Sequence, residues 1–260
     1  MQPPEMSFQL PRPGKALKGM MAAVFAIWVL LTIGIAWLEA KVAADAVAYT
    51  VGTDDVFRGQ VWRLFTAPLI HFGSPGHVLT TLFGLYFLAP TLEDRWGPKK
   101  MLAFLFGSAV FAFVLQVLVG ALVPKLGQRA WFGGLGMVEA VAVAWALNNR
   151  SSTIRLFFVL PVSGTMLLVF IFGMSVLNVI ALQAPTEGLV TPFGGMLAGY
   201  LFGDASPLRP YWLKFRLKRL QAETAALSGA STQRRRAGGP ALRVIHGGGD
   251  KPPKDKRYLN

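Results

Sequence analysis

The chain has 260 residues, of which 53% are hydrophobic and 15% charged, and it contains no cysteine. A charged fraction well below the roughly 25% of an ordinary soluble domain excludes a disordered scaffold. The lack of cysteine excludes a disulfide framework and a thiolate-bound zinc or iron–sulfur centre, and we expect neither metal nor cofactor. Residues 204–260 hold 13 of the 26 Lys and Arg, whereas residues 16–203 are mostly apolar. This division predicts a polytopic membrane protein with a basic tail.

The first apolar run covers residues 16–38 and follows a short N-terminal segment, residues 1–15. About 20 helical residues cross a hydrocarbon core of about 30 Å, so this run is long enough to span a membrane. A cleaved signal peptide is the weaker interpretation, because its apolar stretch is typically only about 7 to 15 residues long.

Five more apolar runs follow, several of them short and rich in Gly and Ala. Short helices of small residues suit the interior of a helical bundle, where backbones approach closely. Gly195 and Gly199 lie on one stripe of such a helix. We therefore predict an all-α membrane protein, a bundle of six transmembrane helices with a long first outer loop, residues 39–76. The five later spans are residues 77–92, 101–123, 133–147, 156–182 and 189–203.

The positive charges indicate the orientation. With six spans, the side that carries both termini collects 21 Lys and Arg, and the other side has five. Positively charged loops stay in the cytoplasm, so both termini are predicted to be cytoplasmic. The composition fits a bacterial inner membrane.

The chain after the last span is basic throughout. In residues 204–223, leucines recur at helical spacing beside Lys and Arg, which predicts an amphipathic juxtamembrane helix bound to anionic lipid. Residues 224–260 have no apolar period, and we expect a disordered basic tail. No pattern of nucleic-acid recognition accompanies the charge, so we expect no nucleic-acid partner.

Several motifs follow one another along the apolar part of the chain. They are Trp62-Arg63 in the first loop, His71 and His77, Glu93 followed by Arg95 and Gly97, residues 155–162, and Gly194-Gly195-x-x-x-Gly199. Taken in order, these motifs resemble the rhomboid family of intramembrane serine proteases, whose core has six helices. The resemblance covers roughly residues 16–203, and it implies that these motifs shape the fold and that His77 begins the second helix.

The resemblance also shows what is missing. The family needs a serine nucleophile in a Gly-x-Ser-Gly turn, but Leu135 takes that place between Gly133-Gly134 and Gly136. The family's histidine base on the sixth helix is replaced by Pro192. A hydroxyl attacks a carbonyl only when a base removes its proton, so the loss of both groups predicts an inactive protein.

Three polar residues of the expected cavity remain. By the resemblance, His77 matches a residue of the oxyanion site and Thr81 stands where an asparagine is usual, and we expect this pair to link two helices. Glu139 lies within the fourth span, where a carboxylate is costly and needs a partner. We expect that partner to be His77.

We therefore expect a rhomboid-like pseudoprotease that binds a transmembrane protein partner without cleaving it. An active serine endopeptidase with unusual catalytic residues and a small proton-linked transporter that uses Glu139 are the alternatives. The inactive interpretation predicts that no hydroxyl contacts an imidazole in the outward-facing cavity.

Overall fold

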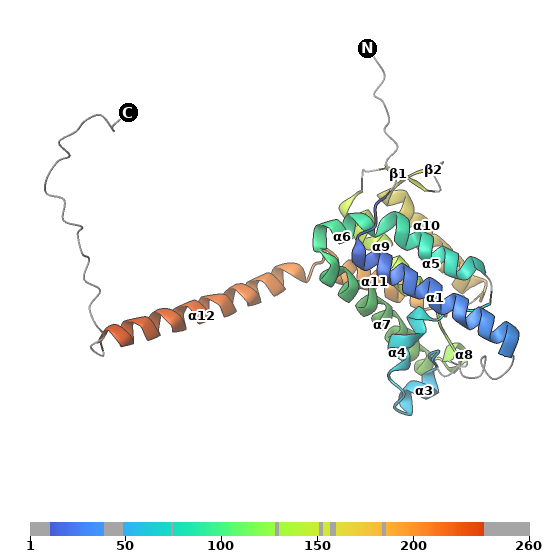
Figure 1. Ribbon diagram of the computed structural model, residues 1–260, viewed down its shortest axis with the longest axis horizontal. Helices are drawn as coiled ribbons and strands as arrows, with labels where there is room; N and C mark the ends of the chain where they lie inside the picture. The colour runs from blue at the N-terminus through green and yellow to red at the C-terminus, as the bar shows by residue number, and fades with distance from the viewer. Residues whose placement is uncertain are drawn as a thin grey trace, which may run out of the picture. The chain divides into compact units, whose positions relative to one another are not determined.

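The computed structural model describes residues 11–38, 49–73, 75–127, 130–150, 153–156, 160–183 and 186–236 (Figure 1). The chain forms two compact units, Met1–Arg209 and Pro210–Asn260. The first unit contains almost all of the helices. The longer ones are α1 (Lys15–Leu38), α5 (Pro75–Leu88), α6 (Pro90–Trp96), α7 (Pro98–Leu122), α9 (Leu135–Asn148), α10 (Gly164–Ile180) and α11 (Thr191–Phe202). The short ones are α3 (Thr53–Phe57), α4 (Arg63–Thr66), the 3-10 turn η1 (Ala67–Leu69) and α8 (Pro124–Gly127).

Two of the described helices, Lys15–Trp37 and Pro98–Leu122, are long and apolar enough to cross a membrane by length and composition. Leu135–Asn148 and Gly164–Ile180 are apolar but shorter. The first unit is thus built from apolar helices of unequal length.

Helix α9 forms the centre of the core and packs against α5, α7, α10 and α11. Its residues Ala140, Val141 and Ala144 are at most 1% exposed. Helix α11 lies directly against it, because a Cβ atom on Gly195 or Gly199 would collide with a backbone carbonyl oxygen of α9. The small-residue stripe of the sequence is therefore the surface on which the two helices meet.

The expected span over residues 156–182 is corrected by the structure. Strands β1 (Thr153–Leu156) and β2 (Leu160–Ser163) pair as an antiparallel hairpin, with Thr153 opposite Ser163. Helix α10 begins only at Gly164, where the Ser163 hydroxyl accepts a hydrogen bond from the Met166 N–H at 3.2 Å. The proline at position 161 opposes a helix here, and the serine cap fixes the true start.

The expected span over residues 77–92 is also divided. Helix α5 ends at Leu88, and Pro90 begins the separate helix α6. Proline has no N–H to continue the helical hydrogen bonds but is well tolerated in a first turn. The other four spans differ from the structure by three residues or fewer at either end.

The second unit continues helix α12 (Arg209–Arg236). The expectation of disorder from residue 224 is wrong as far as Arg236, and residues 237–260 lie outside the described part of the chain. Along α12, the Arg216 guanidinium lies over the Trp212 ring, 5.3 Å from its centroid.

Candidate functional site

The first outer segment is anchored by Arg63. Its guanidinium donates to the Gln60 side chain at 2.7 Å and to the Thr50 carbonyl at 3.0 Å, and it pairs with Asp55 at 3.3 Å. The neighbouring Trp62 is 52% exposed. Of the tryptophan–arginine pair, the arginine thus lies inward, where it joins three parts of this segment, and the tryptophan lies outward.

The turn ahead of α9 is tied to this outer segment. Val51 and Trp131 exchange backbone hydrogen bonds, and the Gly133 N–H donates to the Ala67 carbonyl at 2.9 Å. Gly133 has φ +120°, a conformation that favours glycine, and a Cβ there would lie 2.6 Å from His77 Nε2. The turn therefore brings Gly133, two residues before the start of α9, against His77.

The two positions that lack catalytic groups begin facing helices. Leu135 is the first residue of α9, and Pro192 is the buried second residue of α11. The helices meet beside them, since a Cβ on Gly136 would lie 3.4 Å from Thr191 Cγ2. Neither a leucine nor a proline side chain can act as nucleophile or base.

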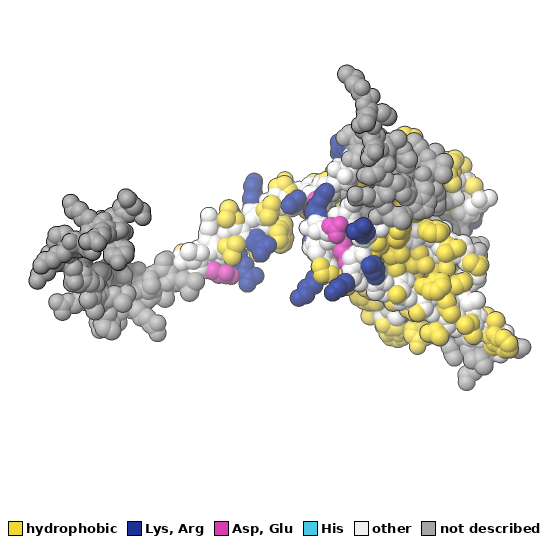
Figure 2. Space-filling view, turned by 45° about the horizontal axis from the view of Figure 1, so that its top comes forward, with side chains coloured by type: hydrophobic (Ala, Val, Ile, Leu, Met, Phe, Trp, Pro, Cys, Tyr) yellow, Lys and Arg dark blue, Asp and Glu magenta, His cyan; other side chains and the backbone are white. Residues whose placement is uncertain are grey.

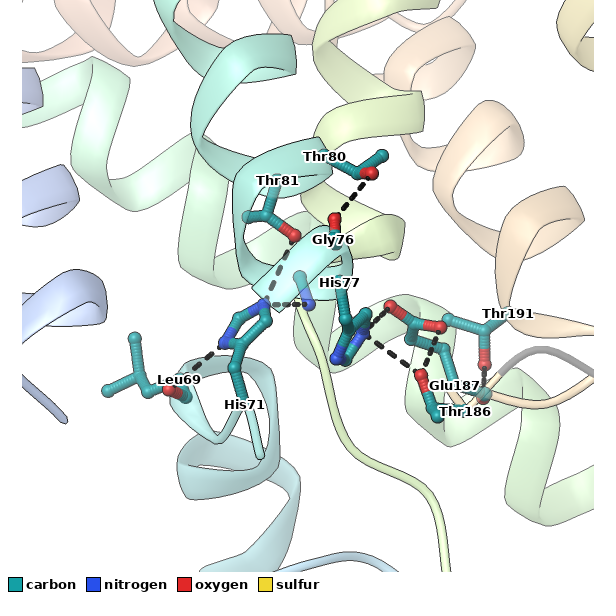
Figure 3. A network of polar contacts seen from close by, with 10 residues as sticks. Leu69, His71, Gly76, His77, Thr80, Thr81, Thr186, Glu187 and Thr191 are labelled. Carbon is teal, nitrogen blue, oxygen red and sulfur yellow. Dashed lines mark hydrogen bonds and ion pairs between the residues drawn. The ribbon is translucent and has the colours of Figure 1, made fainter. Parts of the chain in front are cut away.

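His77 binds a carboxylate that the sequence interpretation overlooked. Its Nε2 lies 2.8 Å from Glu187 Oε1 and 2.9 Å from the Thr186 hydroxyl (Figure 3). The Thr186 hydroxyl also donates to Glu187 Oε2 at 3.0 Å, and the Thr191 hydroxyl donates to the Glu187 carbonyl oxygen. The segment before α11 is thereby joined to the start of α5.

The expectation that no hydroxyl contacts an imidazole in this region is wrong, because Thr186 contacts His77. The arrangement nevertheless differs from a nucleophile–base pair. In a triad the carboxylate holds Nδ1 and leaves Nε2 to the hydroxyl. Here Glu187 and Thr186 share Nε2, while Nδ1 is buried without a hydrogen-bond partner in the part of the chain that the structure describes. An Nε2–H that donates to Glu187 cannot accept a proton from Thr186.

The imidazole of His71 accepts a hydrogen bond from the backbone at the start of α9. The Gly134 N–H donates to His71 Nε2 at 3.2 Å, and the Thr81 hydroxyl lies 3.1 Å from the same nitrogen (Figure 3). His71 Nδ1 faces the Leu69 carbonyl at 3.3 Å, so the network favours a proton on Nδ1. Burial, together with the neighbouring His77, lowers the pKa of His71 to about 4, so the ring is neutral at pH 7. The expected His77–Thr81 link is thus replaced by a His71–Thr81 contact.

Glu139 does not contact its expected partner. His77 is held by Glu187 instead, and Glu139 Oε2 is buried without a hydrogen-bond partner among the described residues. Glu139 lines a cavity of about 420 Å³ between α5, α9 and α10, together with Leu79 and Leu135. The expectation that His77 is the partner of Glu139 is therefore wrong.

Two further polar groups of the site were missed in the sequence. Glu187 is one of only two carboxylates between residues 101 and 203 of the apolar part of the chain, which was a usable signal. Gln116 is buried in α7, and its side chain accepts from the Val190 N–H at 2.8 Å. Among the described residues, no group of three or more His, Asp or Glu side chains could hold a metal ion.

The acidic motif after α5 acts at the opposite end of the bundle. The Glu93 carboxylate accepts backbone N–H bonds from Gly14 at 2.8 Å, from Ala16 at 3.1 Å and from Leu17 at 3.4 Å. Arg95 pairs with Asp204 at 3.5 Å. Both residues therefore join helix ends.

A bundle of apolar helices around a buried polar network, with the starts of two helices facing each other, is typical of a helical membrane protein. Residues 58–206 match the rhomboid domain, and the chain belongs to the rhomboid family. Its members are integral membrane proteins, and we describe the chain as one.

The names of the relatives describe both an active protease and an inactive protein. The chain is 26% identical to the mitochondrial RHOMBOID-like protein 12 of Arabidopsis thaliana, over 50% of this chain and 42% of the relative. It is 29% identical to the Inactive RHOMBOID-like protein 8 of the same plant, over 38% and 29% of the two chains. It is 28% identical to the Rhomboid protease GlpG of Salmonella paratyphi A, over 58% and 49%. The matched region spans less than half the length of each relative.

Proposed function

We propose that this protein is a rhomboid-fold pseudoprotease that binds transmembrane partners without cleaving them. The observation that carries the proposal is the pair of inert side chains, Leu135 and Pro192, at the starts of the facing helices α9 and α11. Acyl transfer needs an activated hydroxyl and a base at that point.

The remaining polar groups support inactivity. A developing oxyanion needs free donors, yet the Gly134 N–H already donates to His71. His77 and Glu187 bind each other at 2.8 Å. The donors and the imidazole are thus engaged in holding the fold together.

Partner binding is supported by the cavity between α5 and α10. It is lined mainly by apolar side chains, among them Leu79, Phe83 and Ile171. The neighbouring face of α10 exposes Val169 and Phe170, which are 69% and 64% accessible. An apolar helix from another protein can pack there through shape, and a cavity carboxylate can bind a polar group on it.

We also propose that α1, α5, α7, α9, α10 and α11 are the six spans, with both termini in the cytoplasm of a bacterium. Helices α9 and α11 have 14 and 12 residues and rise only about 21 and 18 Å, less than a hydrocarbon core of about 30 Å. The central position of α9 explains how it is tolerated, since its neighbours separate it from lipid, whereas α11 packs against α9 and α7 and leaves Leu197 and Tyr200 exposed.

The test is a cleavage assay in proteoliposomes with a labelled transmembrane substrate of the Salmonella GlpG protease, which serves as the active control. We expect no cleavage and no labelling by a serine-reactive fluorophosphonate. A photo-crosslinker at Leu79, in the cavity, should capture the substrate, whereas one at Leu30, which is 70% exposed on α1, should not. Cleavage or covalent labelling would overturn the inactive assignment, and equal capture at both positions would overturn the binding site.

An active peptidase is the second candidate, because the Thr186 hydroxyl lies 2.9 Å from His77 Nε2. If Thr186 were a nucleophile, Thr186→Val would abolish any cleavage, and Glu187→Gln would change its pH profile. We expect neither variant to alter the background level of hydrolysis.

A further inference from the structure

A second polar cluster lies far from the histidines, around Asp204. Its carboxylate accepts a hydrogen bond from the Trp96 indole at 2.6 Å and lies near three cations, Arg95 at 3.5 Å, Lys100 at 3.4 Å and Arg209 at 3.8 Å. These side chains and Asn148 line a cavity of about 420 Å³. The cluster belongs entirely to the first unit of the chain.

The cluster is positively charged overall. Burial would raise the pKa of Asp204, but the Trp96 hydrogen bond and the charges of Lys100 and Arg209 outweigh it and hold the pKa below its usual value. The carboxylate is therefore ionised at neutral pH, and the three cations retain two unbalanced positive charges. The cations are about half exposed, so they remain accessible to an anion.

An apolar groove begins at the same lysine. It follows α7 from Lys100 to Val114, is bordered by Phe202 of α11, and encloses about 530 Å³. From Lys100 to Val114 the helix advances about 21 Å, more than the ~15 Å that one leaflet occupies in a core of about 30 Å. In the first unit, Figure 2 shows Lys and Arg side chains around an acidic patch, beside a broad hydrophobic face.

We propose that the basic cavity and the groove together form a binding site for one anionic phospholipid. The phosphate binds among Arg95, Lys100 and Arg209, and one acyl chain lies in the groove along α7. A headgroup with net negative charge complements the two unbalanced cations better than a zwitterionic one. Lys100 lines both cavities and thus joins the two parts of the site. The inference does not depend on whether the protein cleaves peptides.

The open part of the groove supplies a selective variant. A Cβ on Gly107 would meet nothing within 4 Å, so Gly107→Leu should fill the groove without disturbing the helices. Gly173 of α10 is equally open and lies outside the groove, which makes Gly173→Leu the matched control. For the headgroup, Lys100→Gln is compared with Arg219→Gln, because Arg219 is an exposed cation of α12 paired with Glu223.

The experiment measures lipid retention by native mass spectrometry, with the full chain taken from vesicles of equal phosphatidylglycerol and phosphatidylcholine. We expect preferential retention of one phosphatidylglycerol, about fivefold weaker in Lys100→Gln and unchanged in Arg219→Gln. Gly107→Leu should lose the lipid, whereas Gly173→Leu should keep it. Equal retention of the two lipids, or full retention by Gly107→Leu, would overturn the proposal.

Two further experiments distinguish a phospholipid from the other molecules that could occupy the site. Glycerol phosphate has the headgroup without acyl chains, so it should bind much more weakly than the lipid, and equal binding would mean a soluble-phosphate site. Because the chain has no cysteine, Gly107→Cys gives a unique attachment point for a photo-crosslinker. We expect crosslinks to lipid, and capture of a protein helix instead would overturn the lipid assignment.

Discussion

Glu139 and Glu187 are both buried, but only Glu187 has partners for both carboxylate oxygens. Glu187 binds His77 and Thr186, whereas Glu139 Oε2 has no hydrogen-bond partner among the described residues. A buried polar atom without a partner lowers stability, while a paired one is costly to disturb. The two carboxylates should therefore respond differently to substitution.

We predict that Glu139→Gln folds normally and that Glu139→Leu is as stable as the parent or more stable, because it removes an unsatisfied oxygen. Glu187→Gln should lose about 1–3 kcal/mol, since His77 loses its charged partner. Thermal unfolding in detergent, followed by tryptophan fluorescence, measures both. A larger loss in Glu139→Gln than in Glu187→Gln would show that Glu139 makes an essential contact.

For single residues, the sequence was informative where the identity of a side chain alone determines what chemistry it can perform. Leu135 and Pro192 cannot catalyse whatever surrounds them, so their meaning was readable from the motif. The partner of His77 was not, because Glu187 lies 110 residues away in the chain and comes from a loop. The spacing of residues along one helix favoured Glu139 as the partner of His77, but the tertiary structure places Glu187 there.

Among the helices, α1 depends on a distant residue for its first turn. The N–H groups at a helix start lack partners within the helix, and the Glu93 carboxylate of α6 accepts three of them from Gly14, Ala16 and Leu17. The negative charge also suits the positive end of the helix dipole. The family's acidic motif is thus the attachment point of the first span.

We predict that Glu93→Gln destabilises the protein by about 1–2 kcal/mol, because a neutral amide is a weaker acceptor for these donors. Asp94→Asn is the control, since Asp94 is exposed. Limited proteolysis near the N-terminus should become faster in the first variant only. Equally fast proteolysis of both variants would show that loss of any negative charge has this effect, and would contradict the specific role of Glu93 at the start of α1.

The contact between α9 and α11 gives a second prediction for an element. Gly199→Ala should destabilise the protein by about 1–3 kcal/mol, because the added methyl group collides with the Ala140 carbonyl oxygen. Gly173→Ala, which meets nothing within 4 Å, should be neutral or stabilising. Chemical or thermal unfolding in detergent compares them. A Gly199→Ala variant as stable as Gly173→Ala would contradict the close packing.

The helices could be located from apolar runs because a membrane requires such runs. Residues 153–163 are mostly apolar, and a short apolar run fits a buried strand as well as a helix. Hydropathy alone therefore did not reveal the hairpin. Pro90 divided one expected span for a reason that the sequence did contain. Helix α12 continues beyond its last leucine, where the apolar period had ended.

For the whole molecule, the division of charge is the feature most readily visible in the sequence. Apart from the tail, the proposed cytoplasmic side carries eight Lys and Arg and the outer side five. The number of spans rests on counting the short helices α9 and α11 as spans. The composition therefore indicates the fold class, whereas the number and order of the spans must be inferred from how the helices pack.

We predict that a fluorescent protein fused after residue 236 fluoresces, because it stays in the cytoplasm, while alkaline phosphatase fused there is inactive. A phosphatase inserted at Gly59, in the outer segment, should be active. Activity of the C-terminal phosphatase fusion would contradict the orientation. Together with an active phosphatase at Gly59, it would mean an odd number of spans.

The ring of His71 on the Gly134 N–H also bears on how the protein could change over evolutionary time. Placing a serine at position 135 and a histidine at position 192 would leave the Gly134 N–H occupied and the imidazole of His77 bound to Glu187. Under the proposed function, these two substitutions alone would therefore not produce peptide cleavage. Changes at the buried histidine network would be needed as well.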